Sequence, residues 1–581
     1  METRARPEHL RMIAMTLAEA GAHLTRTNPD FAVEDAMIRG TQFRVFKNAP
    51  TNLRALFQRS AAMHDGGDYL IQGDERWTHA AFCADANRMA HAMTETLGIK
   101  PGDRVAIAMR NCPEILILMT AVINAGAVAV MLNAWWSEEE LDYAFEDSGA
   151  KIVFADGPRY ARIAPLAPAR NLRLIATREA QDGQVGPTYA DLLAGASSDA
   201  WPDTPIDPED DFALMYSSGT TGHPKGVVLT HRGAVSSIWT WAMSLHLPPL
   251  MAPDAPVAPP KKMSVMIVTP LFHVTATHPM FLLSHPVGAR IVLLPKWNAD
   301  DAVRVIDAER VTRFIGVPTQ SADLMQAAAR VGSSLATLDY LGAGGAKRPA
   351  AQVLELAAAF PNAVIASGWG MTETNAAGLS ITGPDYVARP GFAGRLLPPL
   401  QDLRIIGDDG QQVPLGEIGE LCVKSACNMR CYLNKPEATA DTLRDGWLRT
   451  GDLATVDADG YVTIVDRKKS IIIRGGENIS CLDVEGALHR HPDVAEAGVF
   501  PVPDPRLGEI VGAGIQMRPG VATTGADLAA FLAEHIAKFK IPERIWLRAA
   551  PLPRGATDKI DRRALRSECL SNMAAAWARQ A

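Results

Sequence analysis

Short apolar runs rich in β-branched residues alternate with helical stretches through the first two thirds of the chain. Alternation of this kind predicts an α/β architecture with largely parallel sheets. The runs that we predict to be strands are Arg104 to Met109, Lys151 to Ala155, Leu172 to Ala176, Ser264 to Thr269, Arg290 to Leu294, Arg313 to Val317 and Ala363 to Ser367.

The pattern changes after about residue 400. Residues 403–425 contain two β runs around an Asp-Asp-Gly turn, and residues 460–480 add short strands punctuated by glycine. Helical patterns return at Asp483 to His491 and at Thr524 to Ala537. We therefore expect a large N-terminal domain of stacked α/β layers with a β subdomain, followed by a small C-terminal α+β domain.

Two segments allow more than one interpretation. Residues 115–132 are uncharged and approach the ~20 residues that span a bilayer. Because Asn124 and Gly126 interrupt the segment, we favour a buried helix that leads into a buried parallel strand at residues 127–132. Residues 247–260 contain six prolines and are predicted to form an exposed extended loop.

Composition and charge exclude several classes of function. The chain has 581 residues, which predicts two or more domains, and its formal net charge of -8 offers no basic field for nucleic acid. Seven widely spaced cysteines indicate a reducing compartment rather than a disulfide framework. The cysteines at 422, 427 and 431 lack CxxC spacing and a nearby histidine, so we favour ordinary cysteines over a metal site.

Neither end of this sequence shows a recognised targeting signal. The first twenty residues indicate an amphipathic helix rather than a signal peptide, and the last four, Ala-Arg-Gln-Ala, contain no peroxisomal tripeptide. We therefore expect a cytoplasmic enzyme without a transmembrane segment. The sequence leaves the oligomeric state open, and a homodimer is compatible with it.

One stretch concentrates glycine and hydroxyl residues. Residues 216–226 read YSSGTTGHPKG, and successive backbone N–H groups in such a turn form a concave nest for anions. A Walker phosphate loop would instead run from its lysine straight into a helix. Here Lys225 precedes an apolar run that indicates a strand, with Thr230 as the expected N-cap of the next helix. The stretch indicates a different phosphate loop, and a flexible turn remains the alternative.

Further motifs follow this loop in a fixed order. In these residues the chain resembles the adenylate-forming superfamily, which includes acyl-CoA synthetases, aryl-CoA ligases, luciferases and the adenylation domains of peptide synthetases. The resemblance covers roughly residues 45–570. The matching stretches are PLFH at 270–273, GAGGA at 342–346, GWGMTET at 368–374, GWLRTGD at 446–452, DRKK at 466–469, GGEN at 475–478 and TDKIDRRALR at 557–566.

The resemblance implies a reaction in two steps that uses ATP, Mg²⁺ and coenzyme A. A carboxylate attacks the α-phosphate of ATP to give an acyl-adenylate and pyrophosphate, and the thiol of coenzyme A then displaces AMP. It also implies five segments. They are an N-terminal helical extension (1–45), an AMP-binding domain (46–466), a hinge (467–470), a mobile lid domain (471–570) and a tail (571–581).

The resemblance assigns roles within the nucleotide site. Thr220 and Glu373 are the expected magnesium ligands, Thr372 the α-phosphate contact, and Trp369 the ring that stacks on adenine. The phosphate loop comprises Ser217, Ser218, Gly219, Thr220, Thr221, Gly222 and Lys225. The adenine and ribose contacts are Gly344, Gly345, Ala346, Gly368, Trp369, Gly370, Met371, Asp452 and Arg467.

The remaining assignments concern the reacting carboxylate and coenzyme A. By resemblance Lys559 bridges the carboxylate and the α-phosphate, and His273 gates the carboxylate without carrying a proton. Lys469 is the expected hinge residue. Gly475 and Gly476 would line a pantetheine tunnel, and Lys540 would meet a phosphate of coenzyme A. The chain departs from the family where Asp558 replaces a glycine beside Lys559, so we expect a modest effect on rate.

The substrate class is the least determined property. Gly370 stands where synthetases of acetate-sized acids tend to have tryptophan. Together with Gly342, Val274 and the pair Trp135-Trp136, it favours a medium- to long-chain fatty acid. An aromatic or polycyclic acid is the alternative. An amino-acid adenylating enzyme is disfavoured because no aspartate closely follows His273, and a non-catalytic scaffold would need neither Glu373 nor Lys559.

Overall fold

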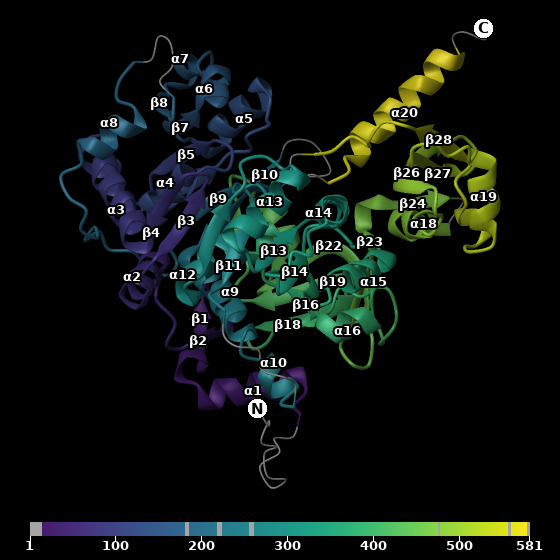
Figure 1. Ribbon diagram of the computed structural model, residues 1–581, viewed down its shortest axis with the longest axis horizontal. Helices are drawn as coiled ribbons and strands as arrows, with labels where there is room; N and C mark the ends of the chain where they lie inside the picture. The colour runs from purple at the N-terminus through teal and green to yellow at the C-terminus, as the bar shows by residue number, and fades with distance from the viewer. Residues whose placement is uncertain are drawn as a thin grey trace.

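The computed structural model describes residues 14–64, 66–179, 185–217, 224–254, 261–474, 477–555 and 559–577. Figure 1 shows a large body formed by the chain up to β23 and a smaller body formed by the elements after it, with α20 (Arg562–Trp577) projecting from the smaller one. The predicted α/β class with a large N-terminal part and a smaller C-terminal part is confirmed.

A seven-stranded sheet forms the first layer of the large body. Its five strands β9, β6, β5, β7 and β8 are parallel, while β10 and β20 add to one edge in antiparallel register. In spatial order the strands are β20 (Cys431–Tyr432), β10 (Lys225–Thr230), β9 (Asp211–Ser217), β6 (Val128–Met131), β5 (Arg104–Ala108), β7 (Ile152–Asp156) and β8 (Arg173–Thr177).

A nine-stranded sheet forms the second layer. Its central strands, from β15 to β3, are parallel, and the edge strands are antiparallel. In spatial order they are β17 (Arg395–Leu396), β16 (Leu379–Thr382), β15 (Val364–Trp369), β14 (Tyr340–Ala343), β13 (Arg313–Gly316), β11 (Ser264–Ile267), β12 (Arg290–Leu293), β3 (Asp68–Gln72) and β4 (Glu75–Thr78).

Helices fill the space between the two sheets and cover their outer faces. One core cluster joins apolar side chains of both sheets with those of α2 (Leu53–Met63), α3 (His79–Glu95), α4 (Pro113–Asn124), α9 (His231–Ser244) and α12 (Leu283–Val287). A second cluster joins the nine-stranded sheet to α13 (Ala299–Glu309), α14 (Pro318–Val331) and α15 (Ala350–Ala359). A third joins the seven-stranded sheet to α5 (Glu138–Ser148) and α6 (Gly157–Ile163).

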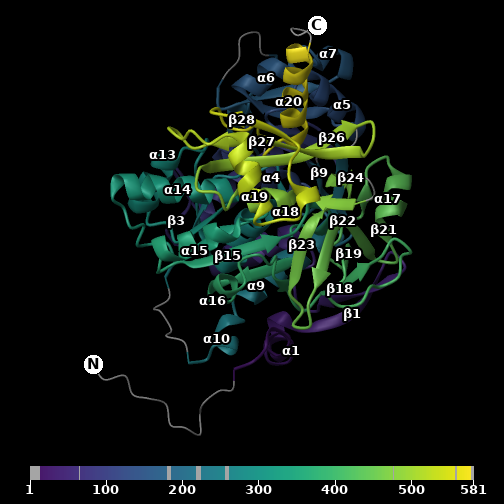
Figure 2. The ribbon, with the colours of Figure 1, turned by 90° about the vertical axis from the view of Figure 1, so that its right-hand side faces the viewer.

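Two smaller sheets complete the fold, one antiparallel and one mixed because β28 pairs with β27 in parallel, and Figure 2 shows them one above the other. The β subdomain comprises β18 (Gln401–Ile406), β19 (Gly419–Ser425), β21 (Leu443–Arg444), β22 (Trp447–Val456) and β23 (Val462–Arg467). The C-terminal sheet comprises β24 (Ile471–Arg474), β25 (Glu477–Ser480), β26 (Val494–Asp504), β27 (Gly508–Met517) and β28 (Arg544–Arg548), flanked by α18 (Cys481–Leu488) and α19 (Gly525–Ala533).

The remaining helices are short. They are α7 (Ala167–Arg170), α8 (Tyr189–Ala194), α11 (Val274–Ala276), the π-helical turn η3 (Thr277–Leu282), α16 (Gly383–Ala388) and α17 (Pro436–Thr442). The 3₁₀ turns that bear on the site are η4 (Thr372–Thr374), η5 (Lys468–Ser470) and η6 (Lys538–Lys540).

The predicted strands and the two C-terminal helices all occur within a few residues of their expected bounds. The apolar segment 115–132 is the buried helix α4 followed by the buried strand β6, so the preferred interpretation is confirmed. A membrane span is not needed to explain it, and among the described residues no helix has the length and apolar character to cross a bilayer.

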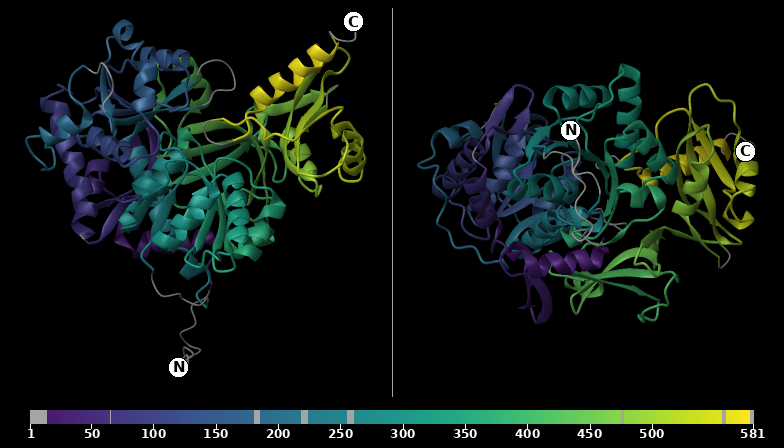
Figure 3. Two further views of the ribbon diagram at one scale, coloured as in Figure 1. Left: turned by 45° about the horizontal axis from the view of Figure 1, so that its top comes forward. Right: turned by 60° about the horizontal axis from the view of Figure 1, so that its bottom comes forward.

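The N-terminal segment differs from the predicted helical extension. After α1 (Leu17–Thr27) it continues through the turn η2 (Pro29–Phe31) into an antiparallel hairpin of β1 (Val33–Ile38) and β2 (Thr41–Phe46). The hairpin lies along the β subdomain, where Arg44 pairs with Asp402 at 2.6 Å, and Figure 3 shows α1 beside these strands. The period-2 pattern of the hairpin is weak: in β1, apolar Met37 is exposed next to buried Ile38.

The proline-rich segment also differs from its prediction. Residues 248–251 form a one-turn helix, α10 (Pro248–Met251), and Leu247 is buried. Proline is tolerated in the first turn of a helix because the N–H that it lacks would have no partner there. Residues 255–260 of the predicted loop lie outside the described residues.

Buried histidines form a hydrogen-bonded chain between β3, α3 and α12. Nδ1 of His285 lies 3.2 Å from Nε2 of His79. Nε2 of His285 lies 3.0 Å from the hydroxyl of Tyr69, and this hydroxyl lies 2.9 Å from that of Ser284. Burial lowers the pKa of His79 from 6.5 to about 4, and it lowers the pKa of His285 in the same direction. Both rings are therefore neutral at neutral pH.

This chain of histidines predicts a loss of stability in mild acid. Because both folded-state pKa values lie below the unfolded value, the histidine contribution is complete above about pH 6.5 and is lost as the pH falls towards about 4, at up to about 1.4 kcal/mol per pH unit for each histidine. Urea unfolding at a series of pH values between 8 and 4.5 measures this slope.

An exposed histidine provides the control. Replacing His535 with asparagine should leave the pH dependence unchanged, because its ring lies on the surface of the C-terminal body. A free energy of unfolding that stays constant between pH 7 and pH 5 would contradict the assignment of neutral buried rings.

Candidate active site

The predicted site residues come from strand ends of the nine-stranded sheet, from a strand of the β subdomain and from a connecting segment of the C-terminal body. β14 leads into Gly344, β15 ends at Trp369, and Glu373 follows in η4. Asp452 lies in β22 of the β subdomain, and Lys559 comes from the C-terminal body. Ligands of open α/β sheets bind outside the carboxyl ends of the strands, and the convergence occurs at such an edge.

The turn that carries Glu373 has an unusual backbone held by side-chain hydrogen bonds. Asn375 and Ala376 both adopt positive φ angles, of 50° and 62°. The side-chain N–H of Asn375 donates to the carbonyl of Cys427 at 2.7 Å, and its Oδ1 accepts from Nε2 of His278 at 2.9 Å. The backbone carbonyl of Asn375 accepts from the hydroxyl of Ser237 at 2.6 Å. Left-handed backbone at a non-glycine residue costs free energy, so these contacts fix the turn in place.

Glu373 is buried and points at a tyrosine. Its side chain is 5% exposed, and its Oε1 accepts a hydrogen bond from the hydroxyl of Tyr432 at 2.8 Å. Burial, together with the negative charge of Glu373, raises the pKa of Tyr432, so the hydroxyl remains a donor. The ammonium of Lys225 lies 4.5 Å from the centroid of the Tyr432 ring. Tyr432 is a site residue that the sequence did not predict, because nothing in its local pattern distinguishes it from a core tyrosine.

Asp452 is the most deeply buried carboxylate of the group, at 3% exposed. Its Oδ2 accepts from the indole N–H of Trp369 at 2.8 Å, and its Oδ1 pairs with Nε of Arg467 at 2.6 Å. Asp452 and Arg467 are directly opposed in the register of β22 and β23. Burial raises the pKa of Asp452, and the charge of Arg467 opposes that rise.

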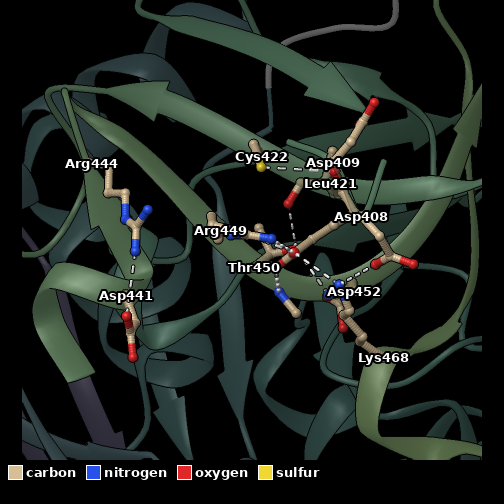
Figure 4. A network of polar contacts seen from close by, with 12 residues as sticks. Asp408, Asp409, Leu421, Cys422, Asp441, Arg444, Arg449, Thr450, Asp452 and Lys468 are labelled. Carbon is tan, nitrogen blue, oxygen red and sulfur yellow. Dashed lines mark hydrogen bonds and ion pairs between the residues drawn. The ribbon is translucent and has the colours of Figure 1, made fainter. Parts of the chain in front are cut away.

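A polar network supports the strand beneath Asp452 (Figure 4). The hydroxyl of Thr450 donates to the carbonyl of Leu421 at 2.8 Å and accepts from the backbone N–H of Asp452 at 3.1 Å. Nearby, the ammonium of Lys468 pairs with Asp408 at 2.8 Å. The network therefore ties the position of Asp452 to neighbouring strands and to the start of the expected hinge.

The glycines around Trp369 permit close packing rather than empty space. A Cβ at Gly370 would lie 2.3 Å from the carbonyl oxygen of Ala376, and one at Gly378 would lie 2.7 Å from the Trp369 ring. The expectation that Gly370 leaves a pocket open is therefore wrong on geometric grounds, because its missing side chain would point into backbone. Gly342 is similar, since a Cβ there would lie 2.8 Å from the Tyr340 ring.

The tip of Lys559 lies over Gly345. A Cβ built on Gly345 would be 3.0 Å from Cε and 3.3 Å from Nζ of the lysine, and Gly345 has a φ of +79°. Glycine tolerates both the positive φ and the close approach. The neighbouring Gly344 donates its N–H to the carbonyl of Gly316 at 3.1 Å. A Cβ built on Gly344 would lie 3.8 Å from the carbonyl oxygen of Gly368 on β15. The structure thus places Lys559 beside the strand ends that carry GAGGA and GWG.

The electrostatic surroundings of Lys559 favour loss of its proton. The residue is exposed to solvent, yet protein atoms, Gly345 among them, surround its ammonium. This crowding, followed by the positive charge of Arg467, lowers the pKa of Lys559 to about 8, and the carboxylate of Asp452 opposes the change. Lys559 and the pair Asp452 and Arg467 therefore form one electrostatic unit.

His273 lies at the N-cap of α11 with its ring packed on Phe272 at 4.7 Å between centroids. Its Nε2 is buried and accepts or donates no hydrogen bond among the described residues. Burial and then the charge of Lys559 lower the pKa of His273 to about 3. The ring is therefore neutral at neutral pH, and the gating role expected of His273 stays a prediction.

A buried aspartate directly precedes the expected hinge at residues 467–470. Asp466 is fully buried, and its Oδ2 accepts from the hydroxyl of Ser480 at 3.0 Å and from the backbone N–H of Leu482 at 3.1 Å. The backbone of Lys469 lies in the following 3₁₀ turn. Lys540 is engaged in an ion pair with Asp483 at 2.6 Å, which restrains the expected phosphate contact.

Part of the predicted site lies outside the described residues. Two residues of the predicted phosphate loop are described. Ser217 ends β9 and Lys225 begins β10, and the two residues are paired in the antiparallel register of these strands. Among the other predicted site residues, Thr372 lies in η4 and Met371 is the N-cap of this turn. Ala346 follows Gly345 in the segment after β14. The residues outside are Ser218, Gly219, Thr220, Thr221, Gly222, Gly475 and Gly476.

The donor set determines what kind of ion could bind. Among the described residues no group of three or more His, Cys, Asp or Glu side chains could hold a metal. Glu373 instead offers a single carboxylate with one oxygen fixed by Tyr432. A hard cation such as Mg²⁺ fits this arrangement when phosphate oxygens supply most of its other ligands.

Apolar side chains gather beside the same edge. Trp241 of α9 lies 3.8 Å from the position of a Cβ on Gly368, and its indole N–H is buried without a partner among the described residues. Val274 is buried, and Trp135 is 46% exposed with its ring 5.2 Å from that of Phe272. Apolar side chains therefore lie near His273, together with the guanidinium of Arg110, which is 5.5 Å from the centroid of the Trp135 ring.

Comparison with known proteins gives matches along most of the chain. The family described as "AMP-binding enzyme" matches residues 57–433, and "AMP-binding enzyme C-terminal domain" matches residues 483–559. A feruloyl-CoA synthase of Amycolatopsis sp is 34% identical over 84% of this chain and 93% of its own length. The long-chain-fatty-acid–CoA ligase FadD13 of Mycobacterium tuberculosis is 32% identical over 85% of this chain and 93% of its own.

A solved structure supports the same relationship. The o-succinylbenzoate coenzyme A synthetase MenE of Bacillus subtilis, in complex with ATP and magnesium ion, superposes with a TM-score of 0.74 at 27% identity. The match covers 88% of this chain and 99% of that one.

The contacts of Lys559 predict how its pKa responds to its neighbours. Replacing Arg467 with glutamine removes a positive charge and should raise the pKa of Lys559, whereas replacing Asp452 with asparagine should lower it. The pH dependence of acetylation at Lys559, followed by mass spectrometry with the exposed Lys151 as the internal control, measures both shifts. Equal titration of Lys559 in all three proteins would contradict the placement of its ammonium.

Proposed function

The chain belongs to the AMP-binding enzyme family, and from this membership we propose that it is an AMP-forming acyl-CoA ligase for a medium- to long-chain fatty acid. The observation that carries the proposal is the position of Lys559 over Gly345, where its pKa responds to the charges of Arg467 and Asp452, while Asp452 accepts a hydrogen bond from Trp369. The site thus combines an aromatic ring, a buried carboxylate and a lysine. ATP, Mg²⁺, coenzyme A and a small carboxylic acid are the proposed ligands.

The first step transfers the nucleotide to the acid. A carboxylate oxygen forms a bond to the α-phosphorus of ATP, and the bond to pyrophosphate breaks. We assign the orientation of the ribose to Asp452 and the platform for adenine to Trp369. Lys559 donates hydrogen bonds that neutralise charge on the reacting oxygens, and such a preorganised donor is worth on the order of 3 kcal/mol. Glu373 supplies a protein oxygen for Mg²⁺, which binds with the phosphates.

The second step transfers the acyl group to sulfur. The thiolate of coenzyme A attacks the carbonyl carbon, and the bond from that carbon to the AMP oxygen breaks. Residues 467–470 form the proposed hinge for this step, with Lys469 within it and Asp466 as its fixed end. Gly475, Gly476 and Lys540 are proposed contacts of coenzyme A, and Lys540 must exchange its ion pair with Asp483 to reach one.

The substrate class rests on the apolar surface beside His273. Trp241 and Trp135 contribute rings and Val274 a buried apolar side chain near this edge, while the guanidinium of Arg110 lies 5.5 Å from the centroid of the Trp135 ring. A large apolar carboxylate would bury such surface, which favours binding by about 25 cal/mol for each Å². Gly370 no longer contributes to this argument. The relatives include ligases named for a fatty acid and for an aromatic acid, so the acid must be tested directly.

The compartment is a further proposal. All seven cysteines are free in the structure, which supports the expectation of a reducing, cytoplasmic environment.

A panel of acids tests the substrate proposal. Pyrophosphate release with ATP and Mg²⁺ is measured for acetate, octanoate, palmitate, benzoate and ferulate, each with and without coenzyme A. We expect the greatest kcat/KM at octanoate or longer and continued turnover that requires coenzyme A. A higher kcat/KM for ferulate than for any fatty acid would replace the substrate class while leaving the ligase activity in place.

Removal of the Lys559 amine tests the assigned donor. The substitution Lys559→Ala should lower the rate of acid-dependent pyrophosphate release by roughly 10² or more, because a preorganised charged donor is lost. Lys538→Ala is the matched control, since Lys538 is an exposed lysine of the same C-terminal body. Retention of the full rate in Lys559→Ala would remove this residue from the mechanism.

A further inference from the structure

Tyr432 lies where three segments of the proposed nucleotide site meet. It belongs to the short strand β20, whose backbone pairs with β10 directly after the phosphate loop, and Tyr432 is opposite Val227 in this register. Its side chain reaches the turn that carries Glu373. We propose that Tyr432 is a positioning residue that holds Glu373 and Lys225 apart and aims both at a metal-bound triphosphate.

The side chain of Tyr432 makes two separate contacts, one through its hydroxyl and one through its ring. The hydroxyl donates to Oε1 of Glu373 at 2.8 Å, and the ring lies 4.5 Å from the ammonium of Lys225. A neutral donor fixes the orientation of a carboxylate while leaving its negative charge available to a cation. An arginine or lysine in the same place would instead neutralise that charge.

The ring also acts as a spacer. An ammonium is attracted to an aromatic face, so the ring holds Lys225 without cancelling its charge. Without the ring, the ammonium of Lys225 could approach the carboxylate of Glu373, and the two would form an ion pair. Such a pair would occupy both the carboxylate proposed for Mg²⁺ and the ammonium proposed for phosphate.

The strand that carries Tyr432 is anchored at several points. The N–H of Met429 donates to the carbonyl of Glu373 at 2.7 Å, and the N–H of Leu433 donates to the carbonyl of Gly226 at 2.8 Å. Arg430 makes two hydrogen bonds to Asp211, at 2.7 and 2.6 Å. Residues 429–433 therefore form a strap that joins the Glu373 turn to the strand after the phosphate loop, with Tyr432 at its centre.

This inference rests on the proposed function, since it assumes that ATP and a metal bind at this site. Its test uses the full chain with ATP and Mn²⁺, a paramagnetic cation that also accepts oxygen ligands. Free Mn²⁺ is followed by electron paramagnetic resonance, and ATP binding by calorimetry with and without the metal. No acid is added, so binding is read without turnover.

Two substitutions separate the contacts. Tyr432→Phe keeps the ring and removes the donor to Glu373, so binding of Mn²⁺ to the ATP complex should weaken by roughly tenfold while metal-free ATP binding is unchanged. Tyr432→Leu also removes the ring and should weaken metal-free ATP binding. Tyr461→Phe is the matched control, because the Tyr461 hydroxyl likewise donates to a carboxylate, that of Asp385, away from the site.

A coupling measurement keeps the result independent of general stability. In Glu373→Gln the metal ligand is already altered, so adding Tyr432→Phe should change Mn²⁺ binding far less than it does in the unaltered chain. Thermal unfolding confirms that each variant is folded. Additive effects of the two substitutions, or equal Mn²⁺ binding by Tyr432→Phe and the unaltered chain, would overturn the positioning role.

A failure of the proposed ligase function would give a different result from a failure of the positioning role. Mn²⁺ and ATP that bind with the expected dependence on Tyr432, but no acyl-CoA formed with any acid, would leave the positioning role standing and remove the ligase activity.

Discussion

The arrangement of the site depends on one buried charge, the carboxylate of Asp452. Taking a carboxylate out of water is costly unless hydrogen bonds and a positive charge replace the lost hydration. The indole of Trp369 and the guanidinium of Arg467 supply this replacement. Because Trp369 ends β15 and Arg467 ends β23, this one requirement fixes the nine-stranded sheet, the β subdomain and the start of the hinge relative to each other.

The same requirement explains how a lysine from the C-terminal body becomes part of the site. Burial and then the charge of Arg467 lower the pKa of Lys559, and Asp452 opposes this change, so the lysine responds to both members of the pair. Gly345 leaves room for its tip. In the proposed reaction, a rotation about residues 467–470 would withdraw this lysine after the first step, and Asp466, fixed by Ser480 and Leu482, would remain at the base of the movement.

The sequence predicted those features that local patterns encode. The apolar runs located the strands, and the ordered motifs brought Trp369, Glu373, Asp452 and Lys559 to attention before their proximity was known. Features that depend on contacts between distant segments could not be predicted. Tyr432 meets Glu373 across 59 residues, and Gly370 is a glycine because the backbone of Ala376 approaches it, which no single-residue pattern shows. The N-terminal hairpin escaped prediction because its period-2 pattern is weak.

The central claim is that the acid is activated by bond formation to the α-phosphorus of ATP. The most direct measurement follows ¹⁸O from a carboxylic acid labelled at both carboxylate oxygens during conversion to its coenzyme A thioester. The account predicts one labelled oxygen in each AMP released, because the carboxylate oxygen that attacks phosphorus remains on AMP when the thiol displaces it. Label found in pyrophosphate or inorganic phosphate, with none in AMP, would contradict the account.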